Sequence, residues 1–165
     1  MQLATRWAGP LTEAMSEYDI ASSVRQAAFL AQVSHESGHL VYVREIWGPT
    51  AAQLRYEGRS DLGNVQPGDG ERFLGRGLIQ ITGRTNYESA ASALNLPLLD
   101  NPALLEAPVN AARSAAWFWQ VHGLNALADT GDFMSITRRI NGGLTGMDDR
   151  LMLWASAKNA LGVGG

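Results

Sequence analysis

Two acidic residues, Glu36 and Glu45, are spaced so that they could act together on one bond. Glu36 lies near the end of an apolar segment, Ala27 to Gly38, that reads AAFLAQVSHESG. This pattern is typical of a buried helix that a glycine ends. At that end the helix dipole disfavours a negative charge by about 0.3 to 1 kcal/mol, and burial adds to the effect. Both effects favour the protonated carboxyl group that general acid catalysis requires.

Glu45 falls in a segment from Leu40 to Trp47 that is rich in β-branched and aromatic residues and is predicted to be extended. Inverting hydrolysis of a glycosidic bond needs an acid and a base whose carboxyl groups are roughly 6.5 to 9.5 Å apart. Glu36 on a helix and Glu45 on the returning chain could face each other across a cleft. By spacing alone, a base could also come from the polar loop that follows, at Glu57, Asp61, Asp69 or Glu71.

A metal site is the alternative interpretation of the same region. His35 to His39 spells H-E-S-G-H, the pattern of zinc peptidases in which two histidines on one helix bind the metal and the glutamate is the base. A zinc site needs a third ligand, but the positions that would extend the motif hold Tyr42 and Glu45. The remaining histidine, His122, is expected to complement a helix C-terminus. We therefore predict no metal and no other cofactor.

The composition favours one globular domain over residues 1–165, without a separate wall-binding module. The chain has 165 residues, of which 45% are hydrophobic, and no cysteine. Its net charge of -3 argues against a nucleic-acid partner. No apolar stretch approaches 18 residues and the N-terminus lacks a signal pattern, so we expect no stable membrane association. We also expect a monomer.

Helical periodicity and capping residues predict a mainly α fold (α+β) with one small β element. Ser23 and Gln26 have the spacing of a capping box for the helix that carries Glu36. The segment Phe73 to Gly83, FLGRGLIQITG, is different, since its glycines suggest close backbone approach. Further helices are expected from Pro10 to about Tyr18, Pro49 to Tyr56, Tyr87 to Leu94, Val109 to His122, Phe133 to Ile140 and Leu151 to Leu161, with further starts at Pro102 and Pro108.

Several sequence blocks resemble one known family. Ala27 to Gln32 leads into His35 to Gly38; Gly75 to Arg84 is followed by Asn86-Tyr87; and Arg138 to Gly143 reads RRINGG. In this order they resemble the family 19 glycoside hydrolases, in particular their short bacteriophage endolysin branch. The resemblance implies a lysozyme-like fold with two lobes and a saccharide cleft between them.

The resemblance also implies residue roles. Glu36 matches the general acid of the family, Glu45 is similar to the general base of the endolysin branch, and Thr82 matches the hydroxyl residue that positions the attacking water. The substrate-binding positions that the resemblance implies are Gln80, Asn86, Tyr87, Asn141 and Arg150.

Alternatives stay open for several of these positions. Gln80 and Asn141 could instead bond loop backbone, and Arg76 could form a structural ion pair. Arg138 and Arg139 compete with Arg150 for the place of an arginine that steadies a catalytic carboxylate.

The chain departs from the plant chitinases of the family. Their base lies farther from the acid, and their disulfides and long substrate loops are missing here. We therefore expect an endolysin that cuts β-1,4 bonds of the peptidoglycan glycan strand by inversion and causes cell lysis. It would be made in the host cytoplasm without a signal peptide and would act on the wall in the periplasm. The alternatives are a chitinase, a zinc metallopeptidase and a saccharide-binding module without catalysis.

Overall fold

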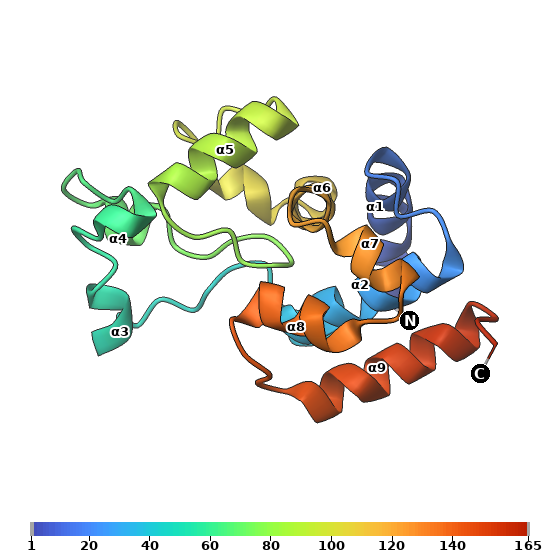
Figure 1. Cartoon of the computed structure of the whole chain (residues 1–165). Coiled ribbons are helices and arrows are strands. Elements are labelled where there is room, and N and C mark those ends of the chain that lie inside the picture. Colours follow the sequence, from blue (N-terminus) through green and yellow to red (C-terminus); the bar gives the residue numbers. More distant parts are fainter. Residues whose placement is uncertain (1, 165) are drawn as a thin grey trace.

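The computed structural model describes residues 2–164, which form a mainly helical protein (Figure 1). This confirms the predicted fold class. The α-helices are α1 (Gln2–Glu17), α2 (Ser23–Glu36), α3 (Ala51–Leu54), α4 (Asp69–Arg72), α5 (Arg84–Leu94), α6 (Pro108–Val121), α7 (Leu124–Asp129), α8 (Phe133–Asn141) and α9 (Met147–Ala160). Two 3-10 helices, η1 (Ser60–Leu62) and η2 (Pro102–Glu106), complete the helical elements.

Helix α2 lies in the core, as its apolar sequence predicts. Ala27, Phe29 and Val33 are each fully buried, and α2 packs along the length of α9. The N-cap is Ser22, whose side chain accepts a hydrogen bond from the backbone of the third helical residue, so the predicted cap at Ser23 is wrong by one position. The helix ends at Glu36, which places this carboxyl group at the edge of the core.

Helix α1 begins earlier than predicted. Pro10 lies inside the helix and not in its first turn, because Trp7 packs in the core on the same face as Leu11 and Ala14. Trp7 also donates a hydrogen bond from Nε1 to the carbonyl of Leu40 at 3.0 Å. Burial of this large ring outweighs the backbone hydrogen bond that a proline in the helix cannot form.

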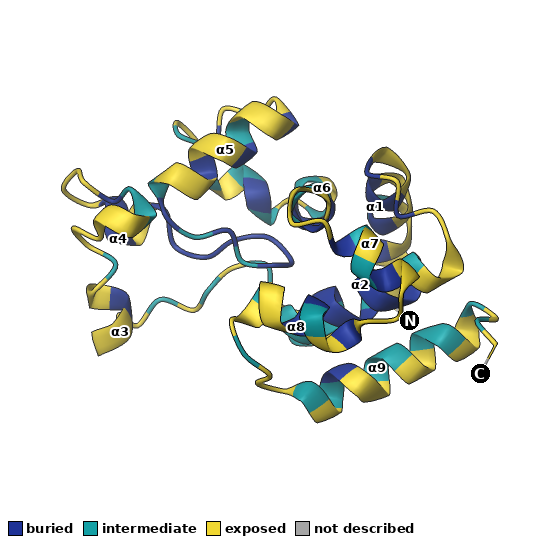
Figure 2. Cartoon of the chain, in the orientation of Figure 1, coloured by how far each residue is buried: buried dark blue, intermediate teal, exposed yellow. Residues whose placement is uncertain are grey.

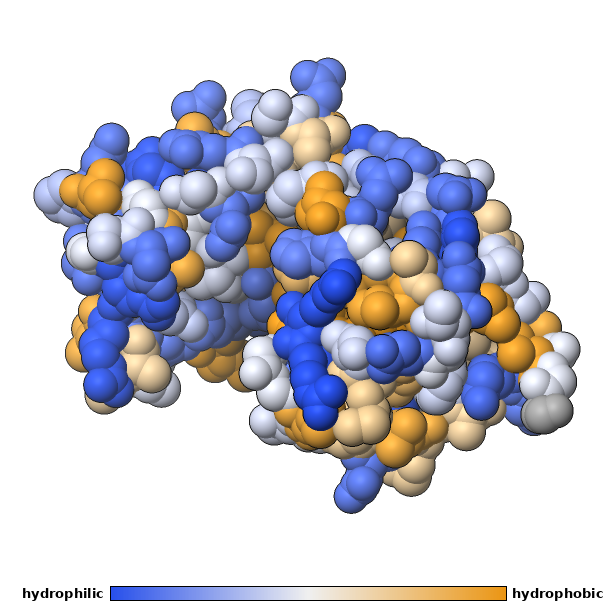
Figure 3. Space-filling view, in the orientation of Figure 1, coloured by the Kyte–Doolittle hydropathy of each residue, from blue (hydrophilic) through white to orange (hydrophobic). Residues whose placement is uncertain are grey.

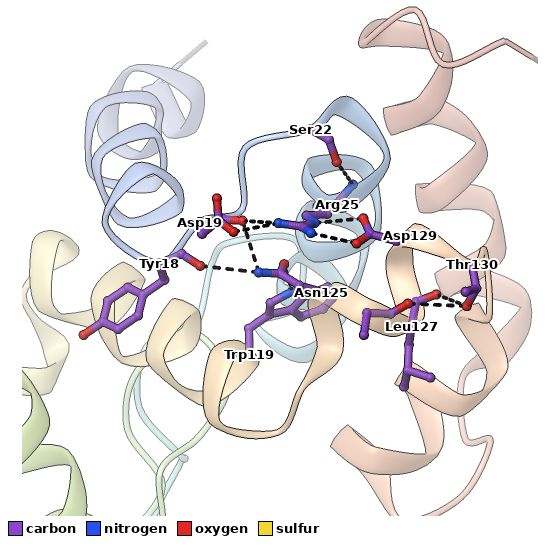
Figure 4. Close-up of polar contacts among 10 residues, drawn as sticks. Tyr18, Asp19, Ser22, Arg25, Trp119, Asn125, Leu127, Asp129 and Thr130 are labelled. Atoms are coloured by element: carbon purple, nitrogen blue, oxygen red, sulfur yellow. Dashed lines mark hydrogen bonds and ion pairs between the residues drawn. The ribbon is translucent and has the colours of Figure 1, made fainter.

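An arginine near the start of α2 connects three elements (Figure 4). Arg25 donates to both carboxylate oxygens of Asp129 in α7 at 2.8 and 2.7 Å, and to Asp19 in the turn after α1 at 2.8 Å. Asn125 of α7 donates to the carbonyl of Asp19 and accepts from the Trp119 indole. These bonds attach the first turn of α2 to α7 and to the turn after α1. The last residue of the same helix is Glu36.

A hairpin over residues 73–83 crosses the centre of the molecule and is buried although it is not helical (Figure 2). Arg76 pairs with Ile81 within the hairpin and with Arg44 of the preceding segment, both in antiparallel orientation. The predicted small β element therefore consists of these isolated bridges, and Leu40 to Trp47 is not a regular strand. The pairing continues through bonds from the Glu45 amide to the Gly75 carbonyl at 2.8 Å and from the Gly77 amide to the Val43 carbonyl at 2.9 Å.

Across residues 2–164, none of the helices combines the length and the apolar character needed to span a membrane. The polar loop after α3 contains two short elements, η1 and α4.

Candidate active site

A groove separates the part of the molecule that contains α3, α4 and α5 from the part that contains α8 and α9 (Figure 3). The hairpin 73–83 lies between these parts in the ribbon view (Figure 1). The predicted acid comes from the end of α2, and the predicted base comes from the segment that pairs with the hairpin.

Glu36 is held by an arginine from the far end of the chain. Arg150, in the first turns of α9, donates from Nη2 to Oε1 of Glu36. The Arg150 side chain is 1% exposed and the Glu36 side chain 19%, so the pair lies at the border between core and groove. Neither Arg138 nor Arg139 makes this contact within the described residues, and Arg139 instead donates to the carbonyl of His122 at 2.7 Å. The guanidinium would stabilise the negative charge that develops on Glu36 when it gives up a proton.

Within residues 2–164, the donors that hold Glu45 are all uncharged. Its Oε1 accepts from the Gln53 amide at 3.0 Å and from the Tyr56 hydroxyl at 3.3 Å, and its Oε2 accepts from the Gly75 backbone amide at 3.1 Å. Burial, together with the charge of Glu45, raises the pKa of Tyr56. The hydroxyl therefore stays protonated at neutral pH and can donate to the carboxylate.

Gln53 has a second role that explains how α3 forms. The oxygen of its side-chain amide accepts from the backbone N–H of Gly48 at 3.1 Å and of Thr50 at 2.8 Å. In return, the Thr50 hydroxyl accepts from the backbone N–H of Gln53. This is the capping box that opens α3. The amide nitrogen of Gln53 remains free to donate to Glu45 and to the Ile46 carbonyl. One residue thus starts the helix and orients the predicted base.

Glu45, Gly75 and Thr82 form a row across three neighbouring segments. Because Arg76 pairs with both Arg44 and Ile81 in antiparallel orientation, Gly75 lies opposite Glu45 on one side and Thr82 on the other. Residues in such a row project from the same face of the paired segments.

Gly75 is the narrow point of this row. A Cβ atom at this position would lie 3.2 Å from Thr82 Oγ1 and 2.4 Å from Gln80 Oε1. Only a glycine therefore lets the two side chains approach over it. The register places the predicted base and the predicted water-positioning hydroxyl on one face, and the missing side chain of Gly75 leaves room for Thr82 and Gln80 there.

A pocket of about 280 Å³ has Thr82 in its wall. It contains three of the predicted residues, Gln80, Thr82 and Asn86, and the Asn86 amide donates to the Thr82 carbonyl at 2.7 Å. The rest of the wall comes from Leu62, Ile81, Trp117, Phe118 and His122. Apolar rings beside amide and hydroxyl groups are the surface that a saccharide needs.

The aromatic part of this wall was not predicted as a site. The helix expected from Val109 to His122 carries three consecutive aromatic residues, Trp117, Phe118 and Trp119, and of these only Trp119 is fully buried. Consecutive helical residues point about 100° apart, so three aromatic residues in a row cannot all face one core. That spacing is the signal in the sequence that could have indicated a ring exposed to the groove. His122 ends α6 as expected, with Nδ1 bonded to the Phe118 carbonyl at 2.8 Å.

Tyr87 does not reach the groove, which corrects the prediction that it binds substrate. It is fully buried, donates to the Leu74 carbonyl at 2.7 Å and accepts from Arg76 at 3.1 Å. Burial raises the pKa of Tyr87 to about 12. Arg76 also forms an ion pair with Glu106 at 2.8 Å, which is the structural alternative considered for it. These contacts of Tyr87 and Arg76 attach the hairpin to α5 and η2.

Gln80 and Asn141 both bond loop backbone in the structure. The amide nitrogen of Gln80 contacts the Gly77 carbonyl at 3.4 Å, and Asn141 Oδ1 accepts from the Thr145 amide at 3.3 Å. Asn141 is exposed as the last residue of α8. Binding of a sugar by these two residues therefore stays a prediction.

The H-E-S-G-H segment lacks the geometry of a zinc motif. The helix ends at Glu36, and His39 has a positive φ of 61°, so the two histidines are not on one helical face. Both contact Asp149, His35 at 2.6 Å and His39 at 3.6 Å. Between residues 2 and 164, no group of three histidine or acidic side chains could hold a metal ion. These contacts instead attach the start of α9 next to Arg150.

Comparison with known proteins gives consistent matches over most of the chain. Residues 12–127 match a family model described as chitinase class I. An endochitinase of Arabidopsis thaliana is 43% identical over 118 residues, which are 71% of this chain and 39% of that protein. The chain thus spans well under half of this plant relative. A glycosyl hydrolase family 19 domain-containing protein of Haemophilus influenzae is 31% identical over 161 residues, covering 81% of this chain and 78% of that protein.

Solved structures agree with the sequence matches. Chitinase C of Streptomyces griseus superimposes with a TM-score of 0.75 and 28% identity over 98% of this chain and 75% of that one. A class IV chitinase of Zea mays does so with a TM-score of 0.72 and 26% identity, over 94% and 79% of the two chains. The structural matches extend over α9 and Arg150, beyond the region of the family model. This chain belongs to glycoside hydrolase family 19.

Proposed function

We propose that this protein is a glycosidase that cleaves β-1,4 bonds of the peptidoglycan glycan strand by an inverting acid/base mechanism. Glu36 is the acid, Glu45 is the base, and Thr82 binds the attacking water. The observation that carries the proposal is the row of Glu45, Gly75 and Thr82, which brings a carboxylate and a hydroxyl to one face beside the pocket of Gln80 and Asn86. Membership of family 19 supports glycan hydrolysis as the reaction class.

The chemistry follows from how the two carboxyl groups are held. Glu36 gives its proton to the oxygen of the leaving sugar, and Arg150 stabilises the carboxylate that remains. Glu45 takes a proton from the water that attacks the anomeric carbon from the opposite side. The amide, phenol and backbone donors around Glu45 orient the carboxylate without adding a second positive charge.

Chitin is the second candidate substrate. The plant relatives and the solved structures are described as chitinases, and chitin shares the β-1,4-linked N-acetylhexosamine backbone with the peptidoglycan strand. We favour peptidoglycan because the chain, unlike the plant chitinases that it resembles, has no cysteine for disulfides and spans well under half of the plant endochitinase. In this proposal the enzyme is an endolysin that acts on the wall in the periplasm and lyses the cell.

Mass analysis of the fragments released from purified peptidoglycan and from chitin oligosaccharides tests the substrate. We expect soluble glycan fragments from peptidoglycan, and the sugar at the new reducing end names the bond that is cut. Fragments from chitin alone would make the protein a chitinase. Tight binding to either polymer without any fragments would instead indicate a saccharide-binding module.

Glu36→Gln is expected to keep the fold and to lower kcat by at least roughly 10² to 10⁴, the usual contribution of a general acid. The amide has nearly the shape of the carboxyl group and its oxygen can still accept from Arg150, so the fold should hold, while loss of the ion pair with this buried guanidinium should lower the melting temperature. Glu71→Gln is the matched control, because this residue of the polar loop is exposed and, within the described part of the chain, bonds the hairpin only through its backbone carbonyl, to the Leu74 amide at 3.4 Å, which the substitution keeps. Near-normal turnover of the Glu36 variant, with loss in the Glu71 variant, would move the acid to the loop.

Gln53→Met is expected to lower kcat by about 10² with little change in KM, because a misplaced base affects the transition state more than substrate binding. Tyr56→Phe should have a smaller effect, since it removes only the 3.3 Å contact to Glu45. Thr50→Ala is the control, because Thr50 caps α3 without touching Glu45. Its N-cap loss costs about 1 kcal/mol of stability. If Thr50→Ala lost as much activity as Gln53→Met, helix stability and not the position of Glu45 would explain the effect.

A further inference from the structure

Gln32 is a polar side chain on the buried face of α2. It is 0% exposed and lies between Phe29 and Val33, which are also fully buried. A primary amide is costly to bury unless its polar atoms are hydrogen-bonded. Both ends of this amide have a partner: Nε2 donates to Thr137 Oγ1 at 2.8 Å, and Oε1 accepts from Arg150 Nη1 at 2.5 Å.

The orientation of the Gln32 amide is set by Thr137 of α8. The Thr137 hydroxyl donates its only proton to the Phe133 carbonyl at 2.9 Å, so towards Gln32 its oxygen can only accept. The amide nitrogen must therefore face Thr137 and the amide oxygen must face Arg150. The reversed amide would place a donor against the guanidinium, which has donors only.

The Gln32 side chain provides one of the three acceptors that bond the Arg150 guanidinium among the described residues. The others are the Thr145 carbonyl, at 3.1 Å from Nε, and Oε1 of Glu36, which accepts from Nη2. A guanidinium is planar and rigid, so bonds at Nε and Nη1 determine the direction of Nη2. The contact to Glu36 is thus fixed by groups that do not touch Glu36.

We infer that Gln32, oriented by Thr137, is a positioning residue that aims Arg150 at the carboxyl group of Glu36. This inference rests on the proposed function, in which Glu36 is the acid. Gln32 is fully buried and therefore cannot contact a substrate in the groove. It touches Arg150 directly, and through its two hydrogen bonds it links α8, α2 and α9 at the point where the acid is held.

The test compares variants at Gln32 and Thr137 on peptidoglycan and on chitin oligosaccharides. Gln32→Leu keeps a similar volume but removes both hydrogen bonds, and Thr137→Val removes the hydroxyl that orients the amide. We expect each to lower kcat by about 10-fold to 10²-fold with KM nearly unchanged, since small displacements of a catalytic group have effects of this size. Thr137→Ser retains the hydroxyl and should restore near-normal kcat.

Gln32→Glu tests the pH dependence of kcat, which should stay unchanged if the role of Gln32 is purely structural. A second carboxylate beside Arg150 competes with Glu36 for the guanidinium and adds a negative charge near the acid. Loss of the proton from the acid then becomes less favourable, so the alkaline limb of the kcat profile should move to higher pH by about one unit. An unchanged profile in a folded Gln32→Glu protein would overturn the inference.

Ser114→Ala is the control for the loss of a buried hydroxyl. Ser114 is 0% exposed and, like Thr137, bonds a carbonyl of its own helix, but it lies in α6 away from Arg150. A similar fall in kcat in this variant, or normal kcat in folded Gln32→Leu and Thr137→Val, would contradict the inference. If Gln32→Leu does not fold, the Thr137 pair and Gln32→Glu decide the question.

A crystal structure of Thr137→Val separates the inference from the proposed function. We expect the Gln32 amide, whose nitrogen loses its acceptor, to shift from its place against Arg150 Nη1 and the Arg150 guanidinium to move relative to Glu36. If wild-type protein cleaves neither polymer, the proposed function fails. The position of Arg150 relative to Glu36 in the Thr137→Val crystal structure still tests whether Gln32 and Thr137 position Arg150. An unmoved Arg150 would show that Thr137 and Gln32 do not aim it.

Discussion

The row of Glu45, Gly75 and Thr82 is the constraint on which the proposed site depends. The hairpin 73–83 is bonded on one side to the segment of Glu45 and folds back on itself on the other. Leu78 also bonds the Ala111 carbonyl at 3.5 Å, which attaches the hairpin to α6. A side chain at Gly75 would collide with Gln80 and press on the Thr82 hydroxyl, so the close pairing of the hairpin depends on a glycine at this position.

The two carboxyl groups are held in physically different ways. Glu36 contacts the full positive charge of Arg150, whereas Glu45 contacts an amide, a phenol and a backbone N–H. A group that becomes negative during the reaction gains most from a fixed cation, because the cation is already oriented when the charge develops. A group that starts negative and gains a proton needs orientation more than charge. The two environments are therefore suited to opposite proton transfers.

The sequence was sufficient to predict the parts that depend on local pattern. The periodicity of Ala27 to Val33 predicted the buried helix, and Gly38 predicted its end next to Glu36. Pro49 indicated the short helix that follows it, and the proline at position 108 marked the start of α6.

The parts that failed or were missed depend on contacts between distant segments. Pro10 suggested a helix start, but burial of Trp7 extends α1 past it. The motif position of Tyr87 suggested a sugar contact, whereas its hydroxyl supports the backbone of Leu74 from within the core. Gln32 and Arg150 are 118 residues apart in the chain, so no local spacing could reveal their hydrogen bond.

The central claim is that Glu36 and Glu45 act from opposite sides of one glycosidic bond. The most direct measurement is the anomeric configuration of the first product, followed by proton NMR during hydrolysis of a β-1,4-linked N-acetylglucosamine oligosaccharide or a peptidoglycan fragment, before mutarotation equilibrates it. The account predicts that the α-anomer appears first, because water held by Glu45 and Thr82 attacks from the face opposite the leaving group. Initial release of the β-anomer would indicate a retaining mechanism and would contradict the assignment of Glu45 as a general base.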